Sequence, residues 1–233
     1  MRVLLIKLTS MGDLIHALPA ITDAQQAIPG ISFDWVIDEA FHEVAEWHPA
    51  TKKVIKSAHR RWKKDIIGSL KNGELISFYR ELRGHPYDLV IDAQNNIKSA
   101  VITRLASNKA HGLDKQSVRE MFAHLAYNQR YSIPKNMHAV SRLRLFFAKV
   151  FGYSLPSSKP CYQIDRQQLR PPTIDLPKKY VVFVHLASWH TKLWPEPNWQ
   201  LLIKLALAAG YDVVLPSGSA EEIEIRACAA HVV

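Results

Sequence analysis

The sequence predicts an α/β protein whose parallel sheets lie in two lobes. Short apolar runs rich in β-branched residues alternate with segments of helical periodicity, and this alternation starts at residue 1 and again at residue 180. A proline-rich stretch separates the two series. Strands that alternate with helices favour a parallel sheet covered by helices on both faces.

The first lobe is predicted to span residues 1–155. Its strands are expected at the short apolar runs 1–8, 33–37, 53–56 and 88–92. Turn and cap residues over 9–13 precede a helix with apolar positions from Leu14 to Ile21. Further helices are expected over 41–47, over 61–83 with a break near Asn72-Gly73, and over 97–106, and the segments 117–127 and 139–151 complete the lobe.

Residues 156–179 are predicted to form a linker, because the prolines in this stretch cannot sustain a helix or a central strand. The second lobe, over 180–233, contains a strand at 180–185, a helix at 196–209, a strand at 212–215 and a helix at 220–230. Val232-Val233 is interpreted as the start of a third strand. Open sheets commonly have about five or six strands, so this Rossmann-like domain is expected to be incomplete in the chain.

The composition is that of a globular protein with anionic partners. The 233 residues are 48% hydrophobic and 22% charged, which excludes a disordered chain, a collagen-like repeat and a coiled coil. Two cysteines exclude a disulfide framework, and no apolar run reaches about 18 residues, so a cytoplasmic protein is expected. The net charge of +9 points to nucleic acid, phosphorylated metabolites or a membrane face.

The turn after the first strand, Ser10-Met11-Gly12-Asp13, is the first candidate for chemistry. Ligands of a doubly wound sheet bind outside the carboxyl ends of the strands, where this turn would lie. Gly12 allows a ligand to approach the backbone, and Asp13 places a carboxylate at the start of a helix. Alternatively, Asp13 only stabilises the helix dipole. A G-x-G-x-x-G fingerprint is absent, which argues against a nicotinamide enzyme.

Two basic segments of the first lobe are candidates for anion binding. The run 59–64 either binds phosphate or carboxylate groups or forms a solvated helix face. The segment 92–99 ends a strand and opens a helix, where free backbone N–H groups and Lys98 could hold an anion. Asn95 or Asn96 is expected to cap that helix.

In the second lobe, the loop after residue 185 is the candidate nucleotide site. Ser188, Thr191 and Lys192 offer hydroxyls and a cation where a nucleotide phosphate would lie. The histidines of the chain have no metal-ligand spacing, so no metal site is expected.

The chain closely resembles the heptosyltransferase I family, which are inverting transferases of glycosyltransferase family nine with a GT-B fold. The matching residues are 1–4, 10–13, 18–20, 22–30, 33–35, 60–62, 92–94, 98–100 and 192–196. The resemblance implies transfer of heptose from ADP-L-glycero-D-manno-heptose to the Kdo of Kdo-lipid A in lipopolysaccharide inner-core biosynthesis. It also implies a protein that is peripherally associated with the cytoplasmic face of the inner membrane.

The resemblance further implies roles for individual residues. Asp13 matches the catalytic base of the family. The acceptor-binding residues would be Lys7, Gly12, Arg60, Arg61, Lys64, Gln94 and Lys98. The donor-binding residues would be Ser188, Lys192 and Glu222. Neither a metal nor a cofactor is expected, because Lys192 would stabilise the departing ADP.

The chain departs from the family pattern at Asn95, where a glycine is common, and at Ala187, which replaces a hydroxyl residue. The family's later Asp-Thr-Gly-x-x-His segment has no counterpart before Val233. Two alternatives therefore stay open, a truncated, non-catalytic acceptor-binding fragment and a sister heptosyltransferase that adds a later heptose. Nucleic-acid binding is the weakest interpretation, because the basic residues are scattered and no reading motif accompanies them.

Overall fold

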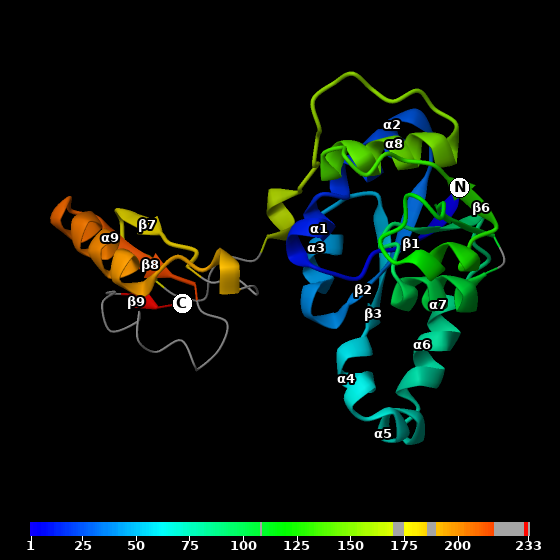
Figure 1. Cartoon of the computed structure of the whole chain (residues 1–233), viewed down its shortest axis with the longest axis horizontal. Coiled ribbons are helices and arrows are strands. Elements are labelled where there is room, and N and C mark those ends of the chain that lie inside the picture. Colours follow the sequence, from blue (N-terminus) through cyan, green and yellow to red (C-terminus); the bar gives the residue numbers. More distant parts are fainter. Residues whose placement is uncertain (108, 170–174, 186–189, 217–230, 233) are drawn as a thin grey trace. The chain divides into compact units, whose positions relative to one another are not determined.

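The structure is a computed structural model that describes residues 1–107, 109–169, 175–185, 190–216 and 231–232 (Figure 1). The chain divides into two compact units, Met1–Leu169 and Arg170–Val233. The first half of the predicted 156–179 linker therefore belongs to the first unit. In the described residues, the helices are too short or too polar to cross a membrane.

The first unit is built on a six-stranded parallel sheet with the order β3-β2-β1-β4-β5-β6. Its strands are β1 (Arg2–Ile6), β2 (Ser32–Asp38), β3 (Thr51–Ser57), β4 (Leu89–Asp92), β5 (Ala110–Leu113) and β6 (Gln129–Tyr131). This arrangement confirms the α/β class and the first four strands. The sequence analysis missed β5 and β6, which have only four and three residues. Such short strands, with His111 and Gly112 in β5, lack an apolar run.

Helices cover both faces of this sheet. They are α1 (Met11–Ile15), α2 (Leu18–Ala27), α3 (His42–Glu46), α4 (His59–Lys64), α5 (Ile66–Lys71), α6 (Glu74–Leu82), α7 (Ile97–Ala106) and α8 (Ala139–Phe151). Two short 3-10 helices lie between them, η1 (Glu39–Phe41) and η2 (Met121–Ala126), and η3 (Arg166–Gln168) follows α8. Helices α2 and α8 lie side by side on one face of the sheet, while α6 and α7 lie on the other (Figure 1).

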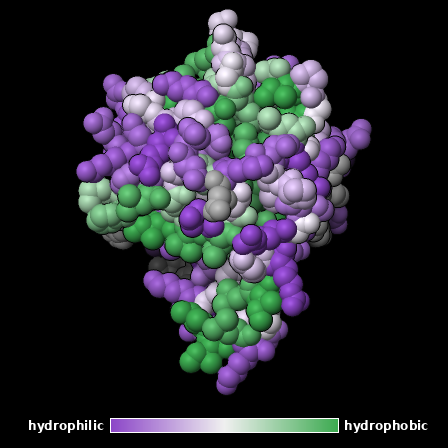
Figure 2. Space-filling model, turned by 90° about the vertical axis from the view of Figure 1, so that its right-hand side faces the viewer, coloured by the Kyte–Doolittle hydropathy of each residue, from purple (hydrophilic) through white to green (hydrophobic). Residues whose placement is uncertain are grey.

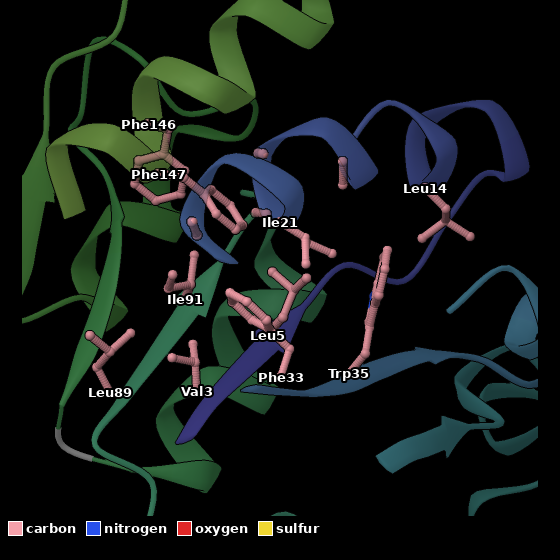
Figure 3. Packing of buried hydrophobic residues seen from close by; sticks show 14 of the residues in the cluster. Val3, Leu5, Leu14, Ile21, Phe33, Trp35, Leu89, Ile91, Phe146 and Phe147 are labelled. Carbon is pink, nitrogen blue, oxygen red and sulfur yellow. The ribbon is translucent and has the colours of Figure 1, made fainter. Parts of the chain in front are cut away.

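Alternate residues of β1 pack into two separate cores. Val3 and Leu5 belong to the cluster that includes residues of α1, α2, α3 and α8. Leu4 and Ile6 belong to a second cluster with residues of α6 and α7. The labelled side chains of β1, β2 and β4 point from the sheet toward those of α2 and α8 in Figure 3. A strand buried on both faces reads as a continuous apolar run, which is why the sequence revealed β1 clearly.

Two predicted helices are divided in the structure. The helix expected after β1 ends at Ile15 and begins again at Leu18, with Pro19 in the first turn of α2. Proline is tolerated there because the first N–H groups of a helix have no intrahelical acceptor. The helix expected over 61–83 breaks not only at Gly73 but also at Asp65, which is the N-cap of α5. The segment 117–127 is helical only in η2.

The second unit has a three-stranded parallel sheet with the order β7-β8-β9. Its elements are β7 (Tyr180–Val182), the 3-10 helix η4 (His190–Lys192), α9 (Glu196–Ala208), β8 (Asp212–Leu215) and β9 (His231–Val232). The strand expected at 180–185 ends earlier, and the expected third strand is confirmed in β9. The helix predicted over 220–230 lies outside the described residues.

A buried ion pair connects α2, α8 and the segment that follows α8. Arg144 Nε lies 2.6 Å from Asp23 Oδ2, and the two side chains are 7% and 3% exposed. The same guanidinium donates to the carbonyl oxygens of Ser158, at 3.0 Å, and of Pro156, at 3.4 Å. Arg144 therefore fixes the segment after α8 to the pair of helices α2 and α8.

We expect Arg144→Met to lower the free energy of unfolding by about 3–5 kcal/mol, because the Asp23 carboxylate would stay buried without its counter-ion. Urea unfolding followed by tryptophan fluorescence measures the change. The control, Glu81→Gln, removes the partly exposed pair between Lys53 and Glu81, whose charged atoms are 3.6 Å apart. It should cost less than about 1 kcal/mol. Equal losses in the two variants would contradict the prediction.

Candidate functional site

A cavity of about 440 Å³ lies in the first unit where β1, β4 and β5 end. Its walls come from the loops that follow these strands and from the start of α8. It is lined by Lys7, Asp13, His16, Ala93, Gln94, Asn95, Leu113, Ser117, Val118, Arg119, Lys135, Ala139, Arg142, Leu143 and Phe146. The cavity thus occupies the position at which doubly wound sheets bind ligands.

The carboxylate of Asp92, at the end of β4, holds the loop that forms one wall. It is completely buried and accepts hydrogen bonds from the backbone N–H groups of Gln94 and Asn95, both at 2.8 Å. Its other oxygen accepts from the Tyr127 hydroxyl at 2.7 Å. Burial raises the pKa of Asp92, while these hydrogen bonds favour its charged form.

Gln94 connects this loop to the loop after β1. Its side-chain oxygen accepts from the backbone N–H groups of Leu8, at 3.0 Å, and Thr9, at 3.3 Å. Gln94 is buried and lines the cavity. Its amide therefore fixes the path of the chain between β1 and Asp13.

Asn95 and Asn96 have separate tasks. Asn95 has a φ of 58°, a left-handed conformation that favours glycine or asparagine, which accounts for its place where the family often has glycine. Its side-chain oxygen also accepts from the Leu113 N–H at 3.2 Å, at the end of β5. Asn96 is the residue that caps α7, because its oxygen accepts from Ser99 N–H at 2.9 Å.

Gly112 makes room for the tyrosine that binds Asp92. A Cβ atom at position 112 would lie 2.3 Å from ring carbons of Tyr127. No such separation occurs between non-bonded carbons, so a side chain at 112 would displace the ring and its hydroxyl from Asp92.

Lys7 is a buried cation in the cavity wall. Its Nζ donates to the Ala93 carbonyl oxygen at 3.2 Å, and its own carbonyl accepts from Trp35 Nε1 at 2.9 Å. Burial lowers the pKa of Lys7 to about 8. The charges of Asp13 and Asp92 act in the opposite direction, and Arg119 and Arg142 lower the pKa further.

Asp13 lies in the first turn of α1, is partly exposed and lines the cavity. Its Oδ2 accepts from both the backbone N–H and the hydroxyl of Ser10, at 3.2 Å each. Among the lining residues that the structure describes, Asp13 is the single carboxylate. The helix-start and cavity interpretations of Asp13 are therefore compatible, since one oxygen serves the cap and the side chain borders the cavity.

The sequence analysis missed three further cations of the cavity, Arg119, Lys135 and Arg142. Arg142 donates through Nη2 to the Ser117 carbonyl oxygen, while its Nε is buried and has no hydrogen-bond partner in the described part of the chain. Burial lowers the pKa of Arg142. These residues follow β5 and β6, and no local motif marks them. The basic composition was the available signal, but it assigns no position.

The other predicted acceptor residues lie outside the lining of this cavity, within the described residues. Arg60 Nε is 3.2 Å from Asp38 Oδ2, and Arg61 binds both Glu39 and Glu74. The remaining three are exposed: Lys64 at the end of α4, Lys98 in the first turn of α7 and Gly12 beside Asp13.

Of the predicted donor residues, Lys192 is described and lies exposed at the end of η4. Ser188 and Glu222 lie outside the described residues. Lys192 belongs to the second unit, and the residues that line the cavity all belong to the first.

Chemically, the cavity combines one carboxylate with four cationic side chains. Such a set favours an anionic ligand, and a carboxylate at its edge can accept a proton from a bound hydroxyl group. Within the described residues, no group of three or more His, Cys, Asp or Glu side chains converges in a way that could hold a metal ion.

Comparison with known proteins gives consistent matches. The family model for glycosyltransferase family 9 (heptosyltransferase) matches residues 75–232. Lipopolysaccharide heptosyltransferase 1 of Pseudomonas aeruginosa is 47% identical over 96% of this chain, which spans 63% of that relative. The protein of the same name from Escherichia coli K12 is 45% identical over 96% of this chain and 70% of its own length.

Solved structures show the same similarity. The structure of E. coli heptosyltransferase WaaC with ADP-2-deoxy-2-fluoro heptose matches all of this chain and 76% of its own, with a TM-score of 0.88 and 43% identity. E. coli ADP-heptose lps heptosyltransferase II matches 97% of this chain and 66% of its own with a TM-score of 0.66 and 18% identity, which shows the fold alone. The predicted GT-B class is thus confirmed.

We expect the pKa of Lys7 to follow the charges that surround it. Asp13→Asn should lower that pKa below about 8, because it removes a negative charge that favours the protonated amine. Arg142→Met should raise it, because it removes a repelling cation. A pH titration of the lysine side chains by carbon-detected NMR measures both shifts. Glu46→Gln, on α3, is the control and should leave Lys7 unchanged; shifts of equal size in all three variants would contradict the prediction.

Proposed function

The chain belongs to glycosyltransferase family 9, the heptosyltransferases, and on this premise we propose that it transfers heptose from ADP-heptose to the Kdo of Kdo-lipid A. The observation that carries the proposal is the cavity in which the Asp13 carboxylate faces four cations. Kdo-lipid A bears carboxylate and phosphate groups, which such a cavity favours electrostatically. The first unit would bind this acceptor and the second unit the donor.

The choice of acceptor is supported by the relatives. The 43% identity to WaaC far exceeds the 18% identity to heptosyltransferase II. A sister enzyme would instead use an acceptor that already carries a heptose. Assays with Kdo-lipid A and with its heptosylated form separate these functions, and transfer to the second acceptor alone would refute the first.

In the proposed reaction, Asp13 acts as the general base. Its carboxylate takes the proton of the acceptor hydroxyl while the hydroxyl oxygen forms a bond to the anomeric carbon of the heptose. The bond from that carbon to the diphosphate oxygen breaks, and its electron pair leaves with ADP. A single displacement of this kind inverts the anomeric configuration and requires a base within hydrogen-bond reach of the hydroxyl.

The cations of the cavity are proposed to hold the carboxylates of the acceptor. Arg142 offers a buried Nε without a partner among the described residues, and Arg119 is exposed at the cavity. An arginine can bind a carboxylate through two parallel hydrogen bonds. Lys7 and Gln94 complete this wall, and we propose that Arg60, Arg61, Lys64 and Lys98, with the backbone at Gly12, contact outlying parts of the acceptor.

On the donor side, we propose that Lys192 neutralises charge that develops on the leaving ADP, with Ser188 and Glu222 contacting the phosphate and nucleoside. A fixed ammonium group can stabilise such charge without a metal ion, so the reaction is proposed to be metal-independent. The protein is proposed to work on the cytoplasmic face of the inner membrane, where a lipid-borne acceptor would be presented.

We expect Asp13→Asn to lower kcat for heptose transfer by about 10²–10⁴-fold, because the amide cannot accept the proton. Titration calorimetry with ADP should show unchanged affinity, since Asn retains an oxygen for the Ser10 N–H. The transfer assay is run with a chelator present. Ser10→Ala is the control for helix capping and should retain most activity. A near-normal kcat in Asp13→Asn would show that Asp13 only stabilises the first turn of α1. If the unmodified chain transfers no heptose, a non-catalytic acceptor-binding fragment is favoured.

We expect Arg119→Met and Arg142→Met to raise KM for Kdo-lipid A about tenfold or more, because each loses charge-assisted hydrogen bonds to the acceptor. KM for ADP-heptose should change little. Steady-state kinetics with each substrate varied in turn measures both values. Arg83→Met removes an exposed arginine of the same unit as a control. An unchanged acceptor KM in both cavity variants would remove these arginines from the site.

A further inference from the structure

A short helix of the first unit exposes an apolar face. Helix α5 carries Ile66, Ile67 and Leu70, which are 56%, 68% and 51% exposed. At 100° per residue these three positions lie within one third of the helix circumference. Figure 2 shows apolar surface at the lower end of the unit, where Figure 1 places α5 between α4 and α6.

Local contacts hold this apolar face outward. Asp65 caps α5, because its Oδ1 accepts from Gly68 N–H at 2.8 Å, and its carbonyl accepts from the Ser69 hydroxyl at 2.6 Å. A Cβ at position 68 would meet Asp65 Oδ2 at 2.0 Å, so a larger residue there would displace the Asp65 side chain from this cap. Ser69, on the opposite side of the helix from Ile67, is buried. Because the cap fixes the helix and Ser69 lies on its buried side, the face with the isoleucines points to solvent.

The neighbouring helices form a fixed support. The ring of Trp62 on α4 packs against Phe78 of α6 with centroids 5.0 Å apart. Its Nε1 donates to Glu74 Oε2 at 2.7 Å, and Arg61 binds the same carboxylate at 2.7 Å. These contacts join helix α4 to helix α6, and α5 connects the two helices along the chain.

Lysines surround the apolar face. Lys63 and Lys64 precede α5, and Lys71 ends it. All three are exposed, and within the described residues none of them forms an ion pair with a carboxylate. Their charges are therefore available to a partner, in contrast to those of Arg60 and Arg61.

We propose that α5 docks on an anionic lipid bilayer, with Ile66, Ile67 and Leu70 entering the boundary between headgroups and acyl chains. An apolar helix face bordered by lysines is typical of interfacial membrane helices. Each lysine near an anionic surface adds attraction. The inference deepens the proposed function and rests on it for its setting, because a lipid-borne acceptor is reached from a membrane surface.

A second protein is a poorer occupant for this face. A stable protein interface buries about 800 Å² on each partner and is depleted in lysine at its centre. Three aliphatic side chains among three lysines are too few and too charged for such a centre. A bilayer needs no complementary shape and takes up isolated apolar side chains beside cations.

The test measures binding of the full chain to vesicles by co-sedimentation. Vesicles of phosphatidylcholine with phosphatidylglycerol are compared with vesicles of phosphatidylcholine alone, and neither contains Kdo-lipid A. The wild-type chain should bind the anionic vesicles, and added salt should weaken this binding. Ile66→Ser with Ile67→Ser should reduce partitioning into the vesicles about tenfold or more, because it removes several carbon groups that would be buried in the bilayer. Replacing Lys63, Lys64 and Lys71 by glutamine should remove the preference for anionic lipid.

The matched control is Val101→Ser with Leu105→Ser on α7, two apolar side chains that are 54% and 45% exposed. It should bind vesicles like the wild type, and circular dichroism should show every variant folded. The proposal is overturned by absent wild-type binding, by unchanged binding of the isoleucine variant, or by an equal loss in the control. Self-association without vesicle binding would assign the face to a second copy. Because the readout needs neither donor nor acceptor, its failure is distinct from loss of heptose transfer.

Discussion

The buried carboxylate of Asp92 is the constraint on which the cavity depends. It ends the strand beside β1 and binds two successive backbone N–H groups together with the Tyr127 hydroxyl. These three bonds fix the turn after β4, and the turn presents Gln94 to the backbone after β1. The positions of Lys7 and Asp13 follow from that contact. The buried Asp92 carboxylate thus determines where the functional side chains of the cavity lie.

The cavity is electrostatically unbalanced because the fold itself brings like charges together. Lys7 is held beside Arg119 and Arg142, and its pKa falls to about 8 as a result of burial and of this repulsion. Asp13 compensates only in part. An anion that enters the cavity relieves the repulsion among the cations, so ligand charge and fold stability are coupled there.

The sequence predicted the elements that are apolar and long, and the site residues that directly follow them. Asp13 was found because its turn follows β1, at the edge where parallel strands end, whereas Lys7 and Gln94 were assigned by the family resemblance. Arg119 and Arg142 were not found, because β5 and β6 are too short to show a pattern and the intervening chain is largely irregular. The order of the strands in the sheet places these arginines at the cavity, and no local spacing of residues in the sequence indicates that order.

The contact between Gly112 and Tyr127 has a consequence for how this chain can change over evolution. The ring occupies the space of a side chain at 112, and its hydroxyl is bound to Asp92. A larger residue at 112 becomes tolerable only after the ring has been lost, and then Asp92 needs a different donor. The residues at positions 92, 112 and 127 therefore constrain one another. Viable sequences are expected to change them together rather than one at a time.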